Sequence, residues 1–311
     1  MRKVIFDVDG DADNLLTVSA ALCDPSLDVL GITTVHGMDS AADAAEHIRA
    51  LLDGMSVSRP VIEGAGAPLM RERMVPAGDD CGSTGVEAAD WMAGRLLESA
   101  EPVTVCLLGA ATNLILLYRN RPEAFARIER VLFMGGSFAF GTINASACHK
   151  VYCDAEAMQL LMHTGVPFYM MPIDETSDIP RGIEIQSLMQ KLPGSLWQHM
   201  ARLCPPPVRA NRYLHTPYAV EVLREPDAFS FRKVKCEVEL HGTLTYGMTV
   251  AYLNDFDGVI DWPDGHRGRR DVGDEERNVW YVQPFDRKTV LERILYRVET
   301  LEWKGGTCEH A

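Results

Sequence analysis

Four aspartates at alternating positions near the start of the chain are the first residues that could do chemistry. Asp7, Asp9, Asp11 and Asp13 end an apolar run in the segment KVIFDVDGDADN, residues 3–14. Like charges at this spacing repel one another, so the folded chain must compensate them with a metal ion, a lysine, protons or hydrogen-bonding hydroxyls. The plain structural alternative is a surface turn whose aspartates cap the next helix.

Strands and helices alternate along the first half of the chain, and this pattern predicts where the aspartates lie. Apolar runs predict strands over 3–9, 27–35, 60–65, 103–109, 130–136 and 166–173. Amphipathic spacing predicts helices over 14–23, 40–55, 85–100, 113–128 and 154–165. The alternation predicts an α/β fold with an open, mostly parallel sheet and helices on both faces. Ligands bind such sheets beyond the carboxyl ends of the strands, where the aspartates and the polar segments TVHGMD, LLGAATN and MGGSF fall.

The second half of the chain predicts insertions on this sheet. Residues 184–203 have helical spacing interrupted by a proline, and 233–253 alternate like a β-hairpin. Residues 258–278 are polar and rich in glycine, which predicts an exposed loop, and 286–301 predict a closing helix. No internal repeat or composition change marks a boundary, so we expect one domain over 1–311.

Composition excludes several classes of protein. The 311 residues carry a formal net charge of −14, whereas nucleic-acid binding needs a basic surface. No apolar stretch approaches the roughly 20 residues that span a bilayer, so no membrane partner is expected. The N-terminus reaches Asp7 before a signal-like apolar segment could form, which predicts a soluble, cytoplasmic protein.

Ordered motifs along most of the chain carry a resemblance to a known family. The opening run of aspartates is followed by LDVLGITTVHG, LLGAATNL, VLFMGGSFAFG, VYCDAEA, LHTPYAV and VELHGTLTYGMTV. In this order the segments resemble the inosine–uridine preferring nucleoside hydrolases, which cleave the N-glycosidic bond of ribonucleosides. The resemblance implies the same α/β fold, a small-molecule nucleoside-like substrate, and a homodimer or homotetramer.

The resemblance also implies roles for particular residues around a bound calcium ion. Asp9 would be a metal ligand and the base that activates water, Asp13 would bind the ribose, and Thr112 would offer its backbone carbonyl to the metal. His215 would lie near the leaving base as a proton donor, which its ordinary near-neutral pKa suits. The carboxylates would stabilise an oxocarbenium-like transition state.

Several positions depart from the pattern that the resemblance implies. Asn14 and Thr216 replace aspartates that bind the metal, so the degenerate metal set is Asp9, Asn14, Thr112 and Thr216. Cys148 and Lys150 replace a glutamate and an asparagine that bind the sugar, and Met38 replaces an asparagine. Because calcium affinity follows the charge of its ligands, Ca²⁺ binding is expected to be weak or lost. The Lys150 ammonium is expected to occupy the space of the metal, or to lie close to it, and so to satisfy Asp9 and Asp13. The plain alternative is a solvated lysine.

The predicted site therefore has three groups of residues. The catalytic residues are Asp9, His215 and Lys150; the substrate-binding residues are Asp13, Asn14, Cys148, Met38, Arg212 and Tyr213. Arg212 suits an anionic substrate group, and Tyr213 could stack on a base. His149 is expected to be structural, and His36 could either pack or contact a ligand.

Three functions fit these residues. The first is hydrolysis of an N-ribosyl bond in a nucleoside or related compound, with weak or no calcium dependence. The second is metal-free chemistry of another kind on the same scaffold, using Lys150 with a low-pKa Cys148. The third is a non-catalytic binder of a sugar-containing ligand, because the fold alone does not choose among them.

Overall fold

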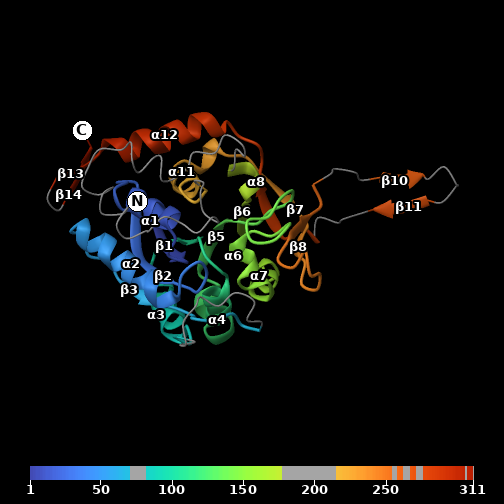
Figure 1. Ribbon diagram of the computed structural model, residues 1–311, viewed down its shortest axis with the longest axis horizontal. Coiled ribbons are helices and arrows are strands. Elements are labelled where there is room, and N and C mark those ends of the chain that lie inside the picture. Colours follow the sequence, from blue (N-terminus) through green and yellow to red (C-terminus); the bar gives the residue numbers. More distant parts are fainter. Residues whose placement is uncertain are drawn as a thin grey trace.

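The apolar runs pair into an eight-stranded sheet of order β3-β2-β1-β4-β5-β6-β12-β7 (Figure 1). The computed structural model describes residues 1–70, 82–176, 215–253, 258–261, 267–270, 276–304 and 307–310. The strands of this sheet are β1 (Arg2–Val8), β2 (Leu27–Thr34), β3 (Val61–Glu63), β4 (Val103–Leu107), β5 (Ile128–Met134), β6 (Phe168–Met171), β12 (Val279–Val282) and β7 (Phe231–Val234). All neighbouring pairs are parallel except β12 with β7. The predicted mostly parallel sheet is confirmed.

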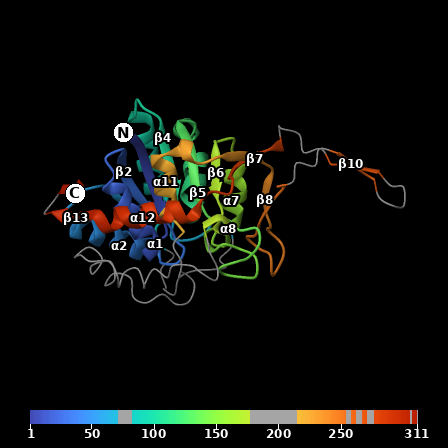
Figure 2. The ribbon, with the colours of Figure 1, turned by 90° about the horizontal axis from the view of Figure 1, so that it is seen from above.

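Helices cover both faces of the sheet because β1 and β4 are buried on both sides. One apolar cluster joins alternate residues of β1 to α1 (Ala12–Leu22), α2 (Ala41–Gly54), α11 (Tyr218–Arg224) and α12 (Arg287–Thr300). The other cluster joins the opposite face to α3 (Val86–Glu98), α4 (Thr112–Asn120), α5 (Pro122–Phe125) and α7 (Ala155–Met162). In Figure 2, α12 runs along one side of the molecule next to α11.

Short elements complete the described part of the chain. These are α6 (His149–Tyr152), α8 (Ile173–Thr176), the 3₁₀ helix η1 (Pro226–Ala228), and the antiparallel pairs β8 (Cys236–Val238) with β9 (Thr249–Ala251), β10 (Gly258–Asp261) with β11 (Arg267–Arg270), and β13 (Leu301–Lys304) with β14 (Thr307–His310). The β10–β11 pair extends away from the body of the molecule (Figures 1 and 2). None of the described helices is long and apolar enough to cross a membrane.

Two expectations need correction, and one lies outside the described residues. The helix expected over 113–128 is two helices, because Pro122 has no N–H to continue α4 and instead begins α5. The loop expected over 258–278 contains the strands β10 and β11. The hairpin expected over 233–253 is confirmed in the pairing of β8 with β9. The helical insertion expected over 184–203 lies outside the described residues.

The strand order places a topological switch point at the end of β1. From β1 the chain builds outward through β2 and β3 on one side, and from β4 onward on the other. The order therefore reverses between β1 and β4, and the loops that follow these two strands diverge there. Such a switch point is where open α/β sheets bind ligands. The aspartate loop follows β1, so it lies at this point.

Candidate active site

A tight turn after β1 brings the aspartates over the end of the sheet. Gly10 has a φ of +81°, in the left-handed region where a side chain is strained, and a Cβ there would lie 2.5 Å from the Cβ of Ala44. The chain then enters α1, whose N-cap is Asp11: its side chain accepts a hydrogen bond from the Asn14 amide N–H at 2.8 Å. The capping role expected as the structural alternative is therefore real for Asp11.

Two glycines let the loops close around Asp9. A Cβ on Gly37 would lie 2.6 Å from the Asp9 Cβ, and one on Gly109 would lie 3.1 Å from the Asp9 nitrogen. Gly37 follows β2 and Gly109 follows β4, so the loops after three neighbouring strands meet at this carboxylate. Asp9 is fully buried as a result.

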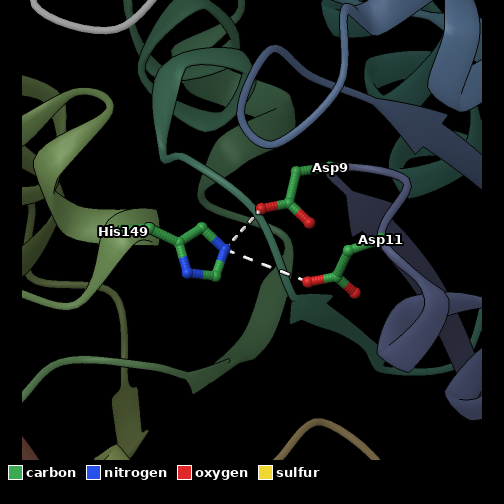
Figure 3. A group of neighbouring side chains, drawn as sticks. All are labelled: Asp9, Asp11 and His149. Carbon is green, nitrogen blue, oxygen red and sulfur yellow. Dashed lines mark hydrogen bonds and ion pairs between the residues drawn. The ribbon is translucent and has the colours of Figure 1, made fainter. Parts of the chain in front are cut away.

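Asp9 receives hydrogen bonds from two side chains. The Asn14 Nδ2 donates to Oδ1 at 3.0 Å, and the His149 Nε2 lies 3.0 Å from Oδ2 (Figure 3). Burial and the charge of Asp11 hold the pKa of Asp9 above its ordinary value, despite the hydrogen bond from His149. A buried carboxylate with a raised pKa is a stronger base than an exposed one.

Asp11 shares both of these partners. Its Oδ1 also accepts from the Asn14 Nδ2, and its Oδ2 lies 3.9 Å from the His149 Nε2 (Figure 3). Burial raises the pKa of Asp11, but the charge of Lys150 and the hydrogen bonds from Asn14 contribute to a net pKa below its ordinary value. Asp11 is therefore an anion at neutral pH.

Asp13 joins α1 to the residues before α11. Its Oδ2 accepts the backbone N–H groups of His215 and Thr216 at 3.0 and 2.8 Å. Its Oδ1 is buried and has no hydrogen-bond partner among the described residues. Burial and the charge of Asp11 raise the pKa of Asp13 to about 7. Among the described residues, this oxygen is therefore an acceptor without a donor.

Thr216 turns its hydroxyl to α1. Its Oγ1 lies 2.6 Å from the Thr17 Oγ1, which itself donates to the Asp13 carbonyl at 2.7 Å. Because the Thr17 hydrogen is used there, Thr216 must be the donor between the two hydroxyls. This segment is thus tied to α1 through the backbone and the side chain of Thr216.

Asp7 supports the site from within the sheet. Its Oδ1 accepts from the Thr33 Oγ1 at 2.7 Å and from the Asn113 Nδ2 at 2.8 Å, so it links β1 to β2 and α4. Burial outweighs these two hydrogen bonds and raises the pKa of Asp7 to about 7. Asp7 is fully buried, as a supporting role requires.

Thr112 lies in a relay of buried polar groups. Its Oγ1 donates to the Asp154 Oδ2 at 2.7 Å, so the His36 Nε2, at 3.0 Å, must donate to Thr112. Burial lowers the pKa of His36 to about 4, so its ring is neutral at physiological pH. Thr112 begins α4, one of the elements that follow the central strands.

Lys150 is buried close to the aspartates without pairing to them. It makes no ion pair with a carboxylate of the described residues, which corrects the expectation that its ammonium directly satisfies Asp9 and Asp13. Burial lowers the pKa of a lysine, but the charges of Asp11 and Asp9 outweigh it and hold the pKa of Lys150 above its ordinary value. Lys150 therefore compensates the aspartates as a nearby charge.

Burial decides the ionisation of His215 and Cys148. Burial is the main reason that the pKa of His215 falls to about 3, so the near-neutral pKa expected for a proton donor is wrong. Its Nδ1 lies 3.1 Å from the Thr176 Oγ1. Cys148 is a buried thiol, and burial raises its pKa, which argues against the low-pKa nucleophile of the second candidate function.

The remaining predicted residues are less well placed. Met38 is half-buried in the segment after β2, next to Gly37. Arg212 and Tyr213 lie outside the described residues.

Two residues of the cluster were not predicted as site residues. Asp11 was expected at most to cap a helix, and His149 was expected to be structural. The alternating spacing brings Asp9 and Asp11 to one side of the turn, and His149 directly precedes the unusual Lys150. These two signals could have identified the pair, but not its mutual contact.

Comparison with known proteins decides the family. The pattern of the inosine-uridine preferring nucleoside hydrolases matches residues 4–292. The chain belongs to this family. An uncharacterized protein of Schizosaccharomyces pombe is 28% identical over 330 residues, which cover 96% of this chain and 99% of that protein. A pyrimidine-specific ribonucleoside hydrolase RihA of Shigella boydii is 29% identical over 280 residues, covering 81% and 90%.

Solved structures agree on the fold of this nucleoside hydrolase family member. An inosine-guanosine nucleoside hydrolase superposes with a TM-score of 0.73 at 23% identity, covering 96% of this chain and 99% of that one. A purine-preferring ribonucleoside hydrolase from Gardnerella vaginalis gives 0.75 at 18% identity, covering 96% and 98%. Membership supports N-ribosyl hydrolysis as the general class of activity.

Proposed function

We propose that this nucleoside hydrolase family member hydrolyses the N-ribosyl bond of a nucleoside or a related compound, with weak or no dependence on Ca²⁺. One observation carries the proposal. Asp9, which the resemblance matches to the water-activating base, is buried at the switch point of the sheet with a raised pKa and two hydrogen-bond partners. Its burial and raised pKa support a role for Asp9 as the base that activates water.

The neighbouring residues support roles in the same reaction. The free Oδ1 of Asp13 is suited to accept a hydrogen bond from a ribose hydroxyl. The negative charges of Asp9 and Asp11 would stabilise the positive charge that develops on the sugar in the transition state. His215 would assist the leaving base as a neutral ring, because burial holds its pKa near 3.

The donor set argues against a strong calcium site. Calcium needs several oxygen ligands, usually six to eight. Asn14 directs its amide N–H groups, not its oxygen, at Asp9 and Asp11. The His149 Nε2 lies 3.0 Å from the second oxygen of Asp9. Hydrogen-bond donors thus surround the carboxylate where calcium would bind.

Release of free base tests the activity. The protein would be freed of metal with a chelator, the chelator removed, and inosine, uridine and cytidine assayed with and without added Ca²⁺. We expect base release that Ca²⁺ changes little and that Asp9→Asn lowers by about 10²–10⁴-fold. A rate that rises by orders of magnitude with Ca²⁺ would contradict the weak calcium dependence.

Two further outcomes separate the alternatives. A nucleoside that raises the melting temperature without any release of base would favour a sugar-binding protein. Activity that is lost in Cys148→Ala while Asp9→Asn remains active would favour other chemistry at Lys150 and Cys148. The raised pKa of the Cys148 thiol makes this second outcome the less expected one.

The proposal includes several wider features of the protein. An anionic substrate group would be recognised by Arg212, with Tyr213 on the base, and one domain would span 1–311. The family resemblance supports a homodimer or homotetramer. Light scattering coupled to size-exclusion chromatography would measure the oligomeric state.

A further inference from the structure

We propose that Asp9, Asp11 and His149 form a binding site for a small borderline divalent cation, with Zn²⁺ as its type, in place of the calcium site that the family implies. The inference goes beyond the proposed function, because ion binding can be measured whether or not the chain hydrolyses nucleosides. It also gives Asp11 and His149 a shared purpose, which neither helix capping nor packing provides.

Three potential ligand atoms converge from two parts of the chain. The Oδ2 atoms of Asp9 and Asp11 come from the loop after β1, and the His149 Nε2 comes from the first residue of α6 (Figure 3). One ligand atom from each of the three residues lies within 4.8 Å of the others, and all three residues are buried. Residues so far apart in sequence meet here only because the fold brings the loop and α6 together.

The spacing of these atoms suits a small ion. The Nε2 lies 3.0 Å from the Asp9 oxygen and 3.9 Å from the Asp11 oxygen. With metal–ligand distances of about 2.1 Å, the ligands of a tetrahedral zinc ion stand about 3.4 Å apart. The two observed distances lie on either side of this value, so for these two contacts shifts of about half an ångström would reach the zinc spacing.

Asn14 holds the two carboxylates in the orientation that the site needs. Its Nδ2 donates to the Oδ1 of both Asp9 and Asp11, and this leaves the two Oδ2 atoms toward His149. In metal sites, the carboxylate oxygen that does not bind the metal is often held by a hydrogen bond from a neutral group such as an amide. The resemblance assigns position 14 to an aspartate that binds the metal, so here the residue would orient ligands instead.

Charge balance also favours a cation. Four buried carboxyl groups, Asp7, Asp9, Asp11 and Asp13, lie in or beside the loop. Lys150 is near them but makes no ion pair with any of them among the described residues. The buried Oδ1 of Asp13 has no partner in the described part of the chain either. A divalent ion between Asp9 and Asp11 would offset much of this negative charge.

The ligand chemistry selects the ion. Imidazole nitrogen is a good ligand for Zn²⁺ and its transition-metal neighbours, whereas Ca²⁺ prefers oxygen alone. Two carboxylates and one histidine leave a fourth position open, as in zinc sites that keep a water or substrate. The His149 Nδ1 has no hydrogen-bond partner among the described residues. A metal-binding histidine usually donates its other ring N–H to a neighbouring acceptor. The affinity for Zn²⁺ should therefore be about 10–100-fold lower than in a site with that hydrogen bond.

Cobalt provides a direct spectroscopic test. Metal-free protein would be titrated with Co²⁺ in visible absorption and with Zn²⁺ and Ca²⁺ in calorimetry. We expect one equivalent of Co²⁺ to give visible bands, Zn²⁺ to displace it, and Ca²⁺ to give neither displacement nor one equivalent of binding heat. His149→Phe should lose the bands. The matched control is His241→Phe, which removes an exposed histidine and should keep them.

The outcomes separate this inference from the proposed function. If His149→Phe fails to fold by circular dichroism, Asp11→Asn provides the second test, and it should also lose the bands. Bands that survive both variants, or wild-type protein that binds neither Co²⁺ nor Zn²⁺, would overturn the metal site. Loss of base release with the bands intact would count against the hydrolase and leave the site standing.

Discussion

The two ends of the central strands carry polar clusters of opposite character. At the amino ends, Thr104 donates to Glu129 at 3.0 Å and Arg130 pairs with the same carboxylate at 2.8 Å. Although partial burial raises the pKa of Glu129, the hydrogen bond and charge of Arg130 outweigh it and the net pKa is lowered. This cluster, which we call the amino-end cluster, borders a cavity of about 220 Å³ that Tyr169 and Trp280 also line.

At the carboxyl ends the acids are buried and their pKa values behave differently. Asp7, Asp9 and Asp13 all have a raised pKa, and their hydrogen-bond donors are mostly neutral groups. A polar cluster selected only for stability would resemble the amino-end cluster, with opposite charges paired near the surface. Burying several acids close together is costly, and such perturbed groups gather at functional sites.

Asp9→Asn should have the largest effect on activity. Loss of a general base typically lowers a rate by about 10²–10⁴-fold. The melting temperature should not fall in parallel, because the change removes a buried charge while the amide can keep a hydrogen bond to Asn14. Initial rates of base release and thermal unfolding would be measured together.

Glu129→Gln is the control for that variant, because it neutralises an acid of the amino-end cluster. Its rate should equal the wild-type rate. Equal losses of activity in Asp9→Asn and Glu129→Gln would mean that the acids at the carboxyl ends of the strands matter no more for activity than the acid at the amino ends.

Lys150→Met should have the largest effect on stability. Removing a buried cation leaves the nearby aspartates uncompensated, which typically costs about 3–5 kcal/mol. The loss should be smaller at pH 5 than at pH 8, since protonated acids need no counter-charge. Urea unfolding at the two pH values would measure it.

The matched control is Lys235→Met, which removes an exposed lysine paired with Glu276 at 3.3 Å. Exposed pairs are worth about 1 kcal/mol or less. If both lysine variants lost equal stability at both pH values, Lys150 would not be balancing the buried acids.

The sequence predicted the sheet well because its signals are local. The apolar runs of β1, β2, β4 and β5 have the length and β-branched content of buried parallel strands, and the polar tails mark their carboxyl ends. Pro122 shows the limit of this reasoning, because helical spacing continues through the residue that ends α4.

The site was less predictable because its contacts are not local. The sequence identified Asp9, Asp13 and Lys150 by resemblance, but the meeting of His149 with Asp9 joins residues 140 positions apart. The pKa of His215 depends on burial by elements that no motif describes. Ionisation states of this kind follow from packing, which the spacing of residues does not reveal.

Asp7 provides a pH test of the carboxyl-end acids. Its pKa is near 7 in the folded chain against an ordinary value of 3.8, so the folded state holds a proton more tightly than the unfolded state. This contribution to stability is fully present below about pH 4 and is lost as the pH rises to about 7. Each pKa unit is worth about 1.4 kcal/mol, so the effect amounts to a few kcal/mol.

Asp7→Asn should remove this part of the pH dependence. The amide oxygen can still accept from Thr33 and Asn113, so any constant loss of stability is separate from the slope. Free energies of unfolding from pH 4 to 8 should decline less steeply in the variant than in the wild type. Parallel curves would mean that Asp7 is ionised throughout, like the exposed acids.

The smallest effect is expected for the ion pair of the amino-end cluster. The side chains of Arg130 and Glu129 are 31% and 30% exposed, so solvent screens their charges. A double-mutant cycle with Arg130→Gln and Glu129→Gln should give a coupling of about 1 kcal/mol or less, and 1 M salt should reduce it further. Because Arg130 also lies 5.2 Å from the Tyr169 ring, Arg130→Gln alone should cost more than Glu129→Gln alone. A coupling energy between Arg130 and Glu129 as large as the stability lost in Lys150→Met would contradict the contrast between the two ends. Burial would then not explain why charges at the carboxyl ends of the strands contribute more to stability.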